Sequence, residues 1–183
     1  MPFIVLYDAN VLYPSILRDL LLRVAQAGLV QAKWSERILD EVVRSLTRNR
    51  PDLNPVSLDR TRSLMNAAIR DVLVTGFEPL IELIRLPDPD DRHVLAAAIK
   101  ARAQVIVTYN VKHFPPVELV KWGIEARHPD DFLVDQFHLD SITVHSAVQR
   151  IADSYRNPAM TATDVCNALE RSGALQLSAL LRR

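Results

Sequence analysis

Three acidic side chains in this sequence could together hold a divalent cation. Asp8 follows the apolar run 3–7, Glu41 lies within an amphipathic segment, and Asp91 begins another. Oxygen ligands suit Mg²⁺ or Mn²⁺, whereas a Zn²⁺ site would require cysteine or histidine. Carboxylates that share a site repel one another, so their pKa values should be raised without a cation. A metal held there could promote attack of water on a phosphate ester.

Polar side chains that could complete this site follow two predicted strands. Asn10 comes two residues after Asp8, and Thr108 and Asn110 follow the apolar run 105–107. In open α/β sheets, ligands bind outside the carboxyl ends of the strands. We therefore expect Asn10, Thr108 and Asn110 to line the same cleft as Asp8, where they would contact substrate or support the acids.

Each acid also has a purely structural interpretation. Asp8 and Asn10 are common turn residues, and Glu41 could be a solvated side chain near basic neighbours on its helix. If Asp88 caps a helix, Asp91 is the third helical residue, where an acid closes a capping box and suits the helix dipole. The residues alone leave both interpretations open, and one acid could serve both purposes.

Two nearby histidines are weaker candidates. His93 lies well away from the helical face of Asp91, which predicts a packing or surface residue and not a ligand. His113 follows the strand-end segment and could touch substrate, although one lone histidine is a weak signal.

The elements that must position these residues alternate between short apolar strands and amphipathic helices. This alternation predicts an α/β fold with a parallel sheet flanked by helices. The predicted strands cover residues 3–7, 105–107 and 123–126. The predicted helices of this part cover residues 14–27, 35–46, 58–69, 88–103 and 129–138, with one further helical turn in the loop 76–86.

From about Asp135 the pattern contains helices alone. They are predicted over residues 141–154, 161–172 and 174–181. We therefore expect two parts, an α/β domain over residues 1–133 and a helical C-terminal extension over residues 134–183.

Composition sets limits on function. The chain has 183 residues, 49% of them hydrophobic, with 22 basic and 22 acidic side chains. The zero net charge gives no whole-chain signal for nucleic acid, so such binding would need bound cations or a local patch. The candidate patch lies on the second and third helices and consists of Arg44, Arg48, Arg50, Arg60, Arg62 and Arg70. A solvated helix face explains these arginines about equally well.

Cellular context is indicated by three further features. Cys166 is the one cysteine, which fits a reducing cytoplasm and predicts a small buried side chain. The first residues lack the basic and apolar regions of a signal peptide. No apolar stretch of about 18 residues occurs, so we expect a cytoplasmic protein that does not span a membrane.

Four motifs in order resemble those of the PIN-domain nuclease family. They are residues 4–12 (IVLYDANVL), residues 39–41 (LDE), residues 88–97 (DPDDRHVLAA) and residues 105–115 (VIVTYNVKHFP). The resemblance covers roughly residues 3–133. It implies that Asp8, Glu41 and Asp91 are the catalytic, metal-binding acids, with Mg²⁺ or Mn²⁺ as the cofactor.

The resemblance also implies an activity and partners. Many PIN domains are ribonucleases, and small bacterial members such as the VapC-like toxins are inhibited by an antitoxin protein. A C-terminal helical extension resembles that of some such toxins. We therefore expect an RNA substrate and a cognate antitoxin, with a homodimer left open. Asn110 stands where many members carry a fourth acid, and His113 where related chains often have aspartate, which puts a full second metal site in doubt.

Two rival functions remain from the sequence. Haloacid-dehalogenase-like phosphatases also place an Asp-x-Asp motif after the first strand, but residue 10 is asparagine here. A catalytically weak RNA-binding module is the other rival, because Asn110 lacks the charge of the family acid.

Overall fold

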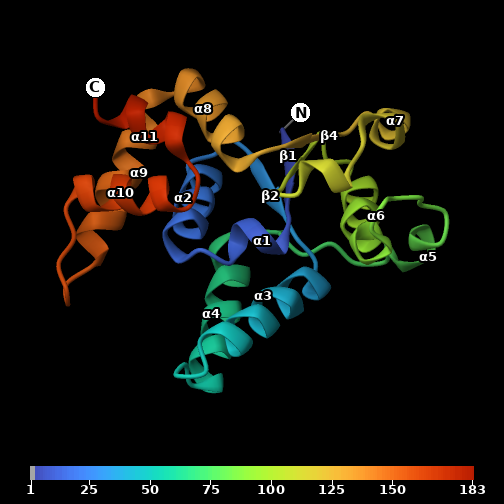
Figure 1. The fold of residues 1–183 in the computed structure, drawn as a ribbon, viewed down its shortest axis with the longest axis horizontal. Helices are drawn as coiled ribbons and strands as arrows, with labels where there is room; N and C mark the ends of the chain where they lie inside the picture. Colours follow the sequence, from blue (N-terminus) through green and yellow to red (C-terminus); the bar gives the residue numbers. More distant parts are fainter. Residues whose placement is uncertain (1–2) are drawn as a thin grey trace.

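The computed structural model describes residues 3–183 and has a four-stranded parallel sheet at its centre (Figure 1). The strands are β1 (Ile4–Tyr7), β2 (Gln31–Lys33), β3 (Val105–Val107) and β4 (Glu125–Arg127). Their order across the sheet is β2-β1-β3-β4. The predicted α/β fold is confirmed. The strand β2 was missed because two of its three residues are polar, which hides it from a search for apolar runs.

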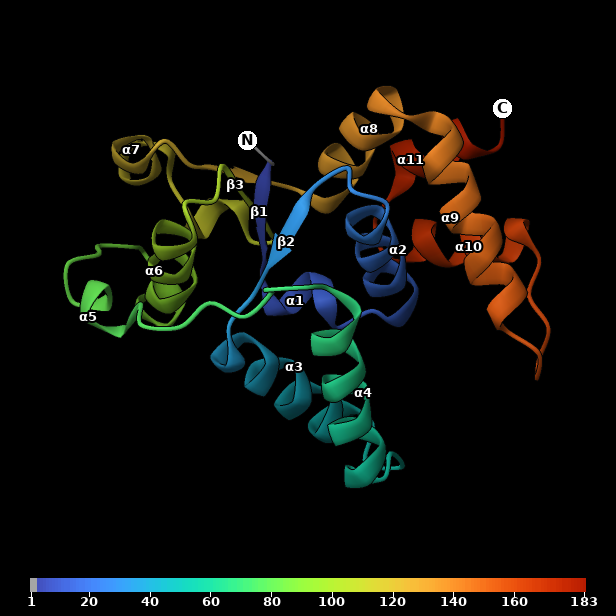
Figure 2. The same ribbon diagram turned by 180° about the vertical axis from the view of Figure 1, so that it is seen from behind.

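Helices cover both faces of the sheet. α2 (Ser15–Gln26) contacts β2 on one side, and α6 (Arg92–Ala101) packs against β1 and β3 on the other. Figures 1 and 2 show the strands between these two helices. The buried face of α2 consists of Ile16, Leu17, Leu20, Leu21 and Val24.

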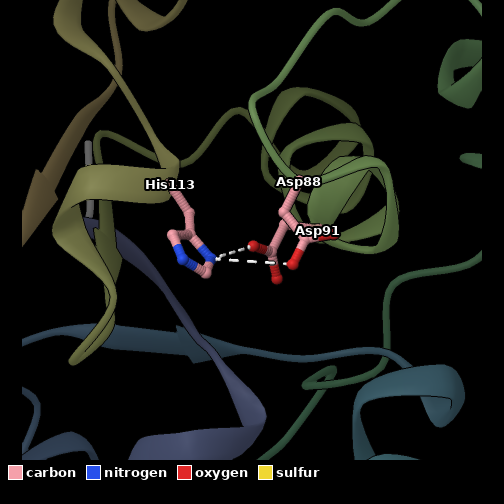
Figure 3. A group of neighbouring side chains, drawn as sticks. All are labelled: Asp88, Asp91 and His113. Carbon is pink, nitrogen blue, oxygen red and sulfur yellow. Dashed lines mark hydrogen bonds and ion pairs between the residues drawn. The ribbon is translucent and has the colours of Figure 1, made fainter.

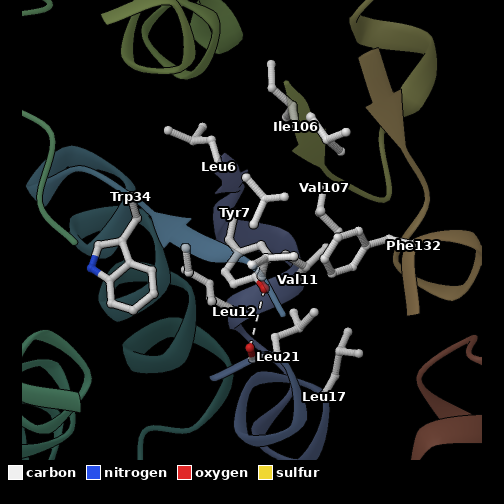
Figure 4. Packing of buried hydrophobic residues seen from close by; sticks show 14 of the residues in the cluster. Leu6, Tyr7, Val11, Leu12, Leu17, Leu21, Trp34, Ile106, Val107 and Phe132 are labelled. Atoms are coloured by element: carbon white, nitrogen blue, oxygen red, sulfur yellow. Dashed lines mark hydrogen bonds between the residues drawn. The ribbon is translucent and has the colours of Figure 1, made fainter. Parts of the chain in front are cut away.

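The core is centred on β1, whose residues Val5, Leu6 and Tyr7 are fully buried. Figure 4 shows that the Tyr7 ring points toward α2, where its hydroxyl donates a hydrogen bond to the Leu21 carbonyl oxygen. The Phe132 ring, from α8 (Pro129–Leu139), meets the Tyr7 ring edge-on at 6.1 Å between centroids. These contacts hold the end of β1, and therefore Asp8, in a fixed place.

Two helices project from the body as an antiparallel pair below the sheet (Figure 2). They are α3 (Glu36–Asn49), which carries Glu41, and α4 (Pro55–Ala68). The Ser35 hydroxyl caps α3 by accepting from the Ile38 amide at 3.2 Å. Between β1 and α2 lies the single-turn helix α1 (Ala9–Leu12), which the sequence analysis did not separate.

The segment that carries Asp91 differs from the prediction. Pro89–Asp91 forms a 3₁₀ turn capped by Asp88, and α6 begins only at Arg92. Asp91 is therefore the residue that precedes the helix, and its side chain makes no capping hydrogen bond. The capping-box interpretation of Asp91 is wrong, and its carboxylate is free for other contacts.

Shorter elements precede α6 and connect β3 to β4. α5 (Glu78–Ile81) supplies the single helical turn expected before Asp88, and α7 (Pro116–Leu119) starts at the second of two consecutive prolines. Two 3₁₀ turns, Val111–His113 and Val120–Trp122, flank α7.

The remaining helices gather beyond α2, on the side away from α6 (Figure 1). They are α9 (Ser141–Ser154), α10 (Ala162–Arg171) and α11 (Leu175–Leu181). α9 and α10 pack on α2, while α11 packs on α8. The buried Asp130 carboxylate ties α8 to α11 because it accepts from the Gln176 and Leu177 amides at 2.9 and 3.0 Å.

The division into residues 1–133 and 134–183 stays a proposal, and it lies inside α8. That helix contacts the sheet through Phe132 and α11 through Asp130. The two proposed parts therefore share α8. Within residues 3–183, no helix combines the length and the apolar character that crossing a bilayer would need.

Candidate active site

A pocket of about 300 Å³ opens where the carboxyl ends of β1 and β3 meet the projecting helix α3. Asp8, Glu41 and Asp91 all line it, although they lie far apart in the sequence. Asn10 and Asn110 line it as well. The other lining residues are Ala9, Tyr13, Ser45 and Asn49. The structure therefore brings together the three predicted acids and both predicted amides.

Asp8 lies at the floor of this pocket and is 4% exposed. Its carboxylate accepts from the Ala9 amide at 2.7 Å and from the Thr108 hydroxyl at 2.8 Å. Burial raises the pKa of Asp8 to about 6, and the negative charges of Asp91 and Glu41 add to the rise against these two hydrogen bonds. Asp8 thus both caps α1 and faces the pocket, so the turn interpretation and the site interpretation hold together.

Thr108 and Asn10 form a polar support around Asp8. Thr108 is fully buried and lies behind the pocket wall, so it contacts Asp8 and not the pocket space. The Asn10 amide nitrogen donates to Asp8 at 3.2 Å and to the Thr108 hydroxyl at 3.1 Å, while its oxygen accepts from the Tyr109 amide at 3.1 Å. These bonds join the loops after β1 and β3 and fix the orientation of the Asp8 carboxylate.

Glu41 is held from the far side of the pocket by His93, which the sequence analysis set aside. His93 is 1% exposed, and its Nε2 lies 2.7 Å from Oε1 of Glu41. Within residues 3–183, neither ring nitrogen of His93 meets a partner at proper hydrogen-bond angles. At this short distance, a small rotation of the Glu41 carboxylate would complete a hydrogen bond with His93. The contact links α3 to α6 across the site.

Asp91 has a histidine neighbour as well. Nδ1 of His113 lies 2.6 Å from Oδ2 of Asp91 and 3.9 Å from Oδ2 of Asp88 (Figure 3). Burial raises the pKa of Asp91, and the hydrogen bond with His113 opposes the rise. Asp91 also lines the pocket, so its carboxylate lies between this histidine and the other acids.

The charge of the pocket favours a cation. Three carboxylates face it, and none of its nine lining residues is lysine or arginine. The burial of Asp8 makes this negative charge costly without a counter-charge. Its polar lining offers carboxylate, amide and hydroxyl oxygens, which is the donor set that Mg²⁺ and Mn²⁺ accept. The residues present therefore fit the cofactor that the resemblance implied.

Two pocket residues were missed although the sequence held a signal for them. Ser45 and Asn49 follow Glu41 by four and eight positions, which places all three on one face of α3. The contact of His93 with Glu41 carries no such signal, because it joins helices that are distant in the sequence.

A larger cavity, of about 580 Å³, lies beside β4 and has mostly apolar walls, including Phe114, Leu119 and Ile124. It contains none of the predicted site residues. The chemistry therefore places the candidate active site at the smaller pocket, where the acids converge.

This arrangement, a parallel sheet with carboxylates gathered at the ends of its central strands, is the one that the sequence motifs implied. A family model described as the PIN domain matches residues 4–112. The chain belongs to the PIN domain family. This membership overturns the rival assignment to a haloacid-dehalogenase-like phosphatase.

A second family model, described as the VapC50 C-terminal domain, matches residues 129–183. The curated relative "Putative ribonuclease VapC50" of Mycobacterium tuberculosis is 47% identical to this chain over 79 residues. The match covers 43% of this chain and 47% of the relative, so it spans about half the length of that protein. No solved structure matches the chain significantly.

Proposed function

We propose that this protein is an endoribonuclease that hydrolyses RNA phosphodiester bonds with the help of Mg²⁺ or Mn²⁺. The observation that carries the proposal is the convergence of Asp8, Glu41 and Asp91 in one pocket that has no cationic side chain in its lining. Family membership and the name of the Mycobacterium tuberculosis relative support a nuclease that acts on RNA.

In this proposal each acid has a defined task. Asp8, Glu41 and Asp91 would hold the cation, which supplies positive charge that offsets the charge developing on the phosphate and favours ionisation of water. Asn10 and Thr108 keep the Asp8 carboxylate in place through the hydrogen bonds described above, and His93 keeps Glu41 in place. Asn110, at the rim, offers its amide to the substrate.

A basic surface for the RNA backbone lies next to the pocket. Arg44 and Arg48 follow Glu41 by three and seven positions on α3, so they share its helical face, and both are exposed. Of the six arginines predicted to form a basic patch, three pair with nearby acids, so fewer are available to bind phosphates. These are Arg50 with Asp52, Arg62 with Glu36 and Asp40, and Arg70 with Asp71.

Removing Arg44 and Arg48 should weaken RNA binding without changing the chemistry. For the double variant Arg44→Ala/Arg48→Ala we expect the slope of log affinity against log salt to fall by about 1.4, since each lost phosphate contact removes about 0.7 for single strands. KM should rise while kcat changes little. Filter binding of a labelled RNA at several salt concentrations, together with steady-state kinetics, measures both.

Arg150→Ala is the matched control, because Arg150 is an exposed arginine on α9, among the C-terminal helices beyond α2. An equal loss of salt dependence in this control would show that the arginines of α3 have no special role.

We further propose that the protein is the toxin of a toxin–antitoxin pair, with a cognate antitoxin protein as its inhibitor. The match of residues 129–183 to the VapC50 C-terminal domain and the ribonuclease relative support this assignment. A free ribonuclease in the cell would damage its host, so an inhibitor is expected.

Expression of the chain alone should arrest the growth of a bacterial host, because no antitoxin is present. Asp8→Asn should relieve the arrest at equal protein level, since it removes one acid from the pocket. RNA from the arrested cells should show new fragment ends that are missing with the variant. Equal arrest by both versions would contradict a toxic role for the site.

The remaining alternative, a catalytically weak RNA-binding module, is motivated by Asn110 at the rim. Such a module would bind RNA with the same salt dependence but would leave its length unchanged. Electrophoresis of the bound RNA after incubation with Mg²⁺ therefore separates the two functions.

A further inference from the structure

A second group of metal-ligating side chains lies beside the pocket and is distinct from it in composition. Asp88, Asp91 and His113 each offer one ligand atom, and these atoms lie within 4.8 Å of one another. Figure 3 shows the three side chains pointing into one shared space, with the two acids on the turn before α6 and the histidine on the turn after β3. Asp88 and His113 do not line the carboxylate pocket, whereas Asp91 belongs to both groups.

The backbone leaves these ligand atoms available. Asp88 caps the 3₁₀ turn through its Oδ1, which accepts from the Asp90 amide at 2.9 Å, so its Oδ2 remains directed toward His113. Asp91 makes no capping bond. His113 ends the 3₁₀ turn 111–113 and is anchored by its own amide, which donates to the Asn110 carbonyl oxygen at 2.9 Å.

The exposure of the three side chains suits a hydrated ion. Their exposed fractions are 43% for Asp88, 19% for Asp91 and 39% for His113. An ion could enter from solvent and complete its coordination with water, and small rotations would bring the three atoms to bonding distance. Mg²⁺ keeps oxygen ligands, whereas an imidazole nitrogen favours ions later in the first transition series.

We propose that Asp88, Asp91 and His113 form a site for a divalent transition-metal ion that binds Mn²⁺, Co²⁺ or Zn²⁺ in preference to Mg²⁺. The site shares Asp91 with the carboxylate pocket, and in that respect alone it rests on the proposed function. The protein would then have two adjacent metal positions, one in the carboxylate pocket and one at His113. The imidazole of His113 would give the second position its preference for transition metals. A plain hydrogen bond or ion pair between His113 and Asp91 is the rival explanation of the same contacts.

Optical titration with Co²⁺ tests the site directly, because ligand-field bands report a nitrogen ligand without any need for activity. The chelated protein should develop visible Co²⁺ bands that are lost in His113→Gln and weakened in Asp88→Asn. In calorimetry, His113→Gln should lower the Co²⁺ affinity of one site by at least about tenfold. Losing a group that only supports a metal ligand already lowers metal affinity by about this much. His145→Gln, at an exposed histidine on α9, is the control and should change neither result.

Thermal unfolding of the chelated variants shows whether they fold. His113→Ala serves as a second variant if His113→Gln does not fold. Co²⁺ spectra and affinities that are the same in wild type and in a folded His113 variant would overturn the site and leave the ion pair.

The outcome is distinguishable from failure of the proposed function. The Glu41→Gln variant disables the carboxylate pocket but leaves all three ligands of the second site. We expect it to retain the Co²⁺ bands that depend on His113, whether or not the wild type cleaves RNA. Loss of these bands in Glu41→Gln would contradict a separate site, while absent RNA cleavage with intact bands would contradict the ribonuclease alone.

Discussion

Glu41→Gln is expected to lower the rate of metal-dependent RNA cleavage by about 1,000-fold, the scale of losing one group that stabilises charge in a transition state. Glutamine keeps the size of the side chain but removes one of the three negative charges that face the pocket. It can still contact His93, so the link between α3 and α6 should survive. Single-turnover cleavage of a labelled RNA at saturating Mg²⁺ measures the loss, and circular dichroism confirms the fold.

The neighbouring acid offers a matched control. Asp40 lies on the same helix, is 53% exposed and pairs with Arg62 at 2.6 Å, away from the pocket. Asp40→Asn should therefore cleave RNA at nearly the wild-type rate. A wild-type rate in Glu41→Gln, or an equal loss in both variants, would contradict the role proposed for Glu41.

The metal-free protein should lose stability as pH rises from about 4 to about 6, because Asp8 must then ionise inside the fold. Its pKa is raised from the ordinary value of 3.8 to about 6, so the folded state holds the proton more tightly than the unfolded state. As pH rises, Asp8 therefore loses its proton in the unfolded chain before it does so in the folded one. The free energy of unfolding falls through this window. About two pH units at 1.36 kcal/mol each amount to a loss of about 3 kcal/mol.

Asp8→Asn isolates this effect from the other ionisable groups. The difference in unfolding free energy between the variant and the wild type should grow in favour of the variant by about 3 kcal/mol between pH 3.5 and pH 7. Urea titrations in EDTA measure it. Added Mg²⁺ at pH 7 should then raise the stability of the wild type more than that of the variant. If the unfolding free energies of the two proteins change with pH in parallel, the pKa of Asp8 is not raised by the fold, and this prediction is wrong.

Much of the site can be predicted from the order of residue types along the chain. Asp8 comes directly after one apolar run and Asn110 three residues after another. Because parallel strands end at one edge of a sheet, the meeting of these two residues is a consequence of topology. Glu41 lies at the border of the apolar stripe of α3, which directs it toward a cleft and not into the core. Local patterns of this kind predict the acids and amides of the pocket, but not Tyr13, Ser45 and Asn49, which also line it.

Other features depend on contacts that no local pattern contains. His93 was expected on the surface or in packing, yet it is buried against Glu41 because α3 and α6 meet across the site. The start of α6 at Arg92 was also missed, since Asp88-Pro89 fits a helix start as well as the 3₁₀ turn that is present. That turn is what directs Asp91 toward His113.

We propose that the acidic pocket cleaves RNA only when it holds a divalent cation. The most direct measurement is cleavage of a fluorophore-labelled RNA by the purified chain after exhaustive chelation, followed by titration with Mg²⁺ or Mn²⁺. We expect no cleavage in EDTA and restored cleavage as either ion is added, with no restoration in Asp8→Asn. Cleavage that persists in the chelated protein, or that returns equally in Asp8→Asn, would contradict the account.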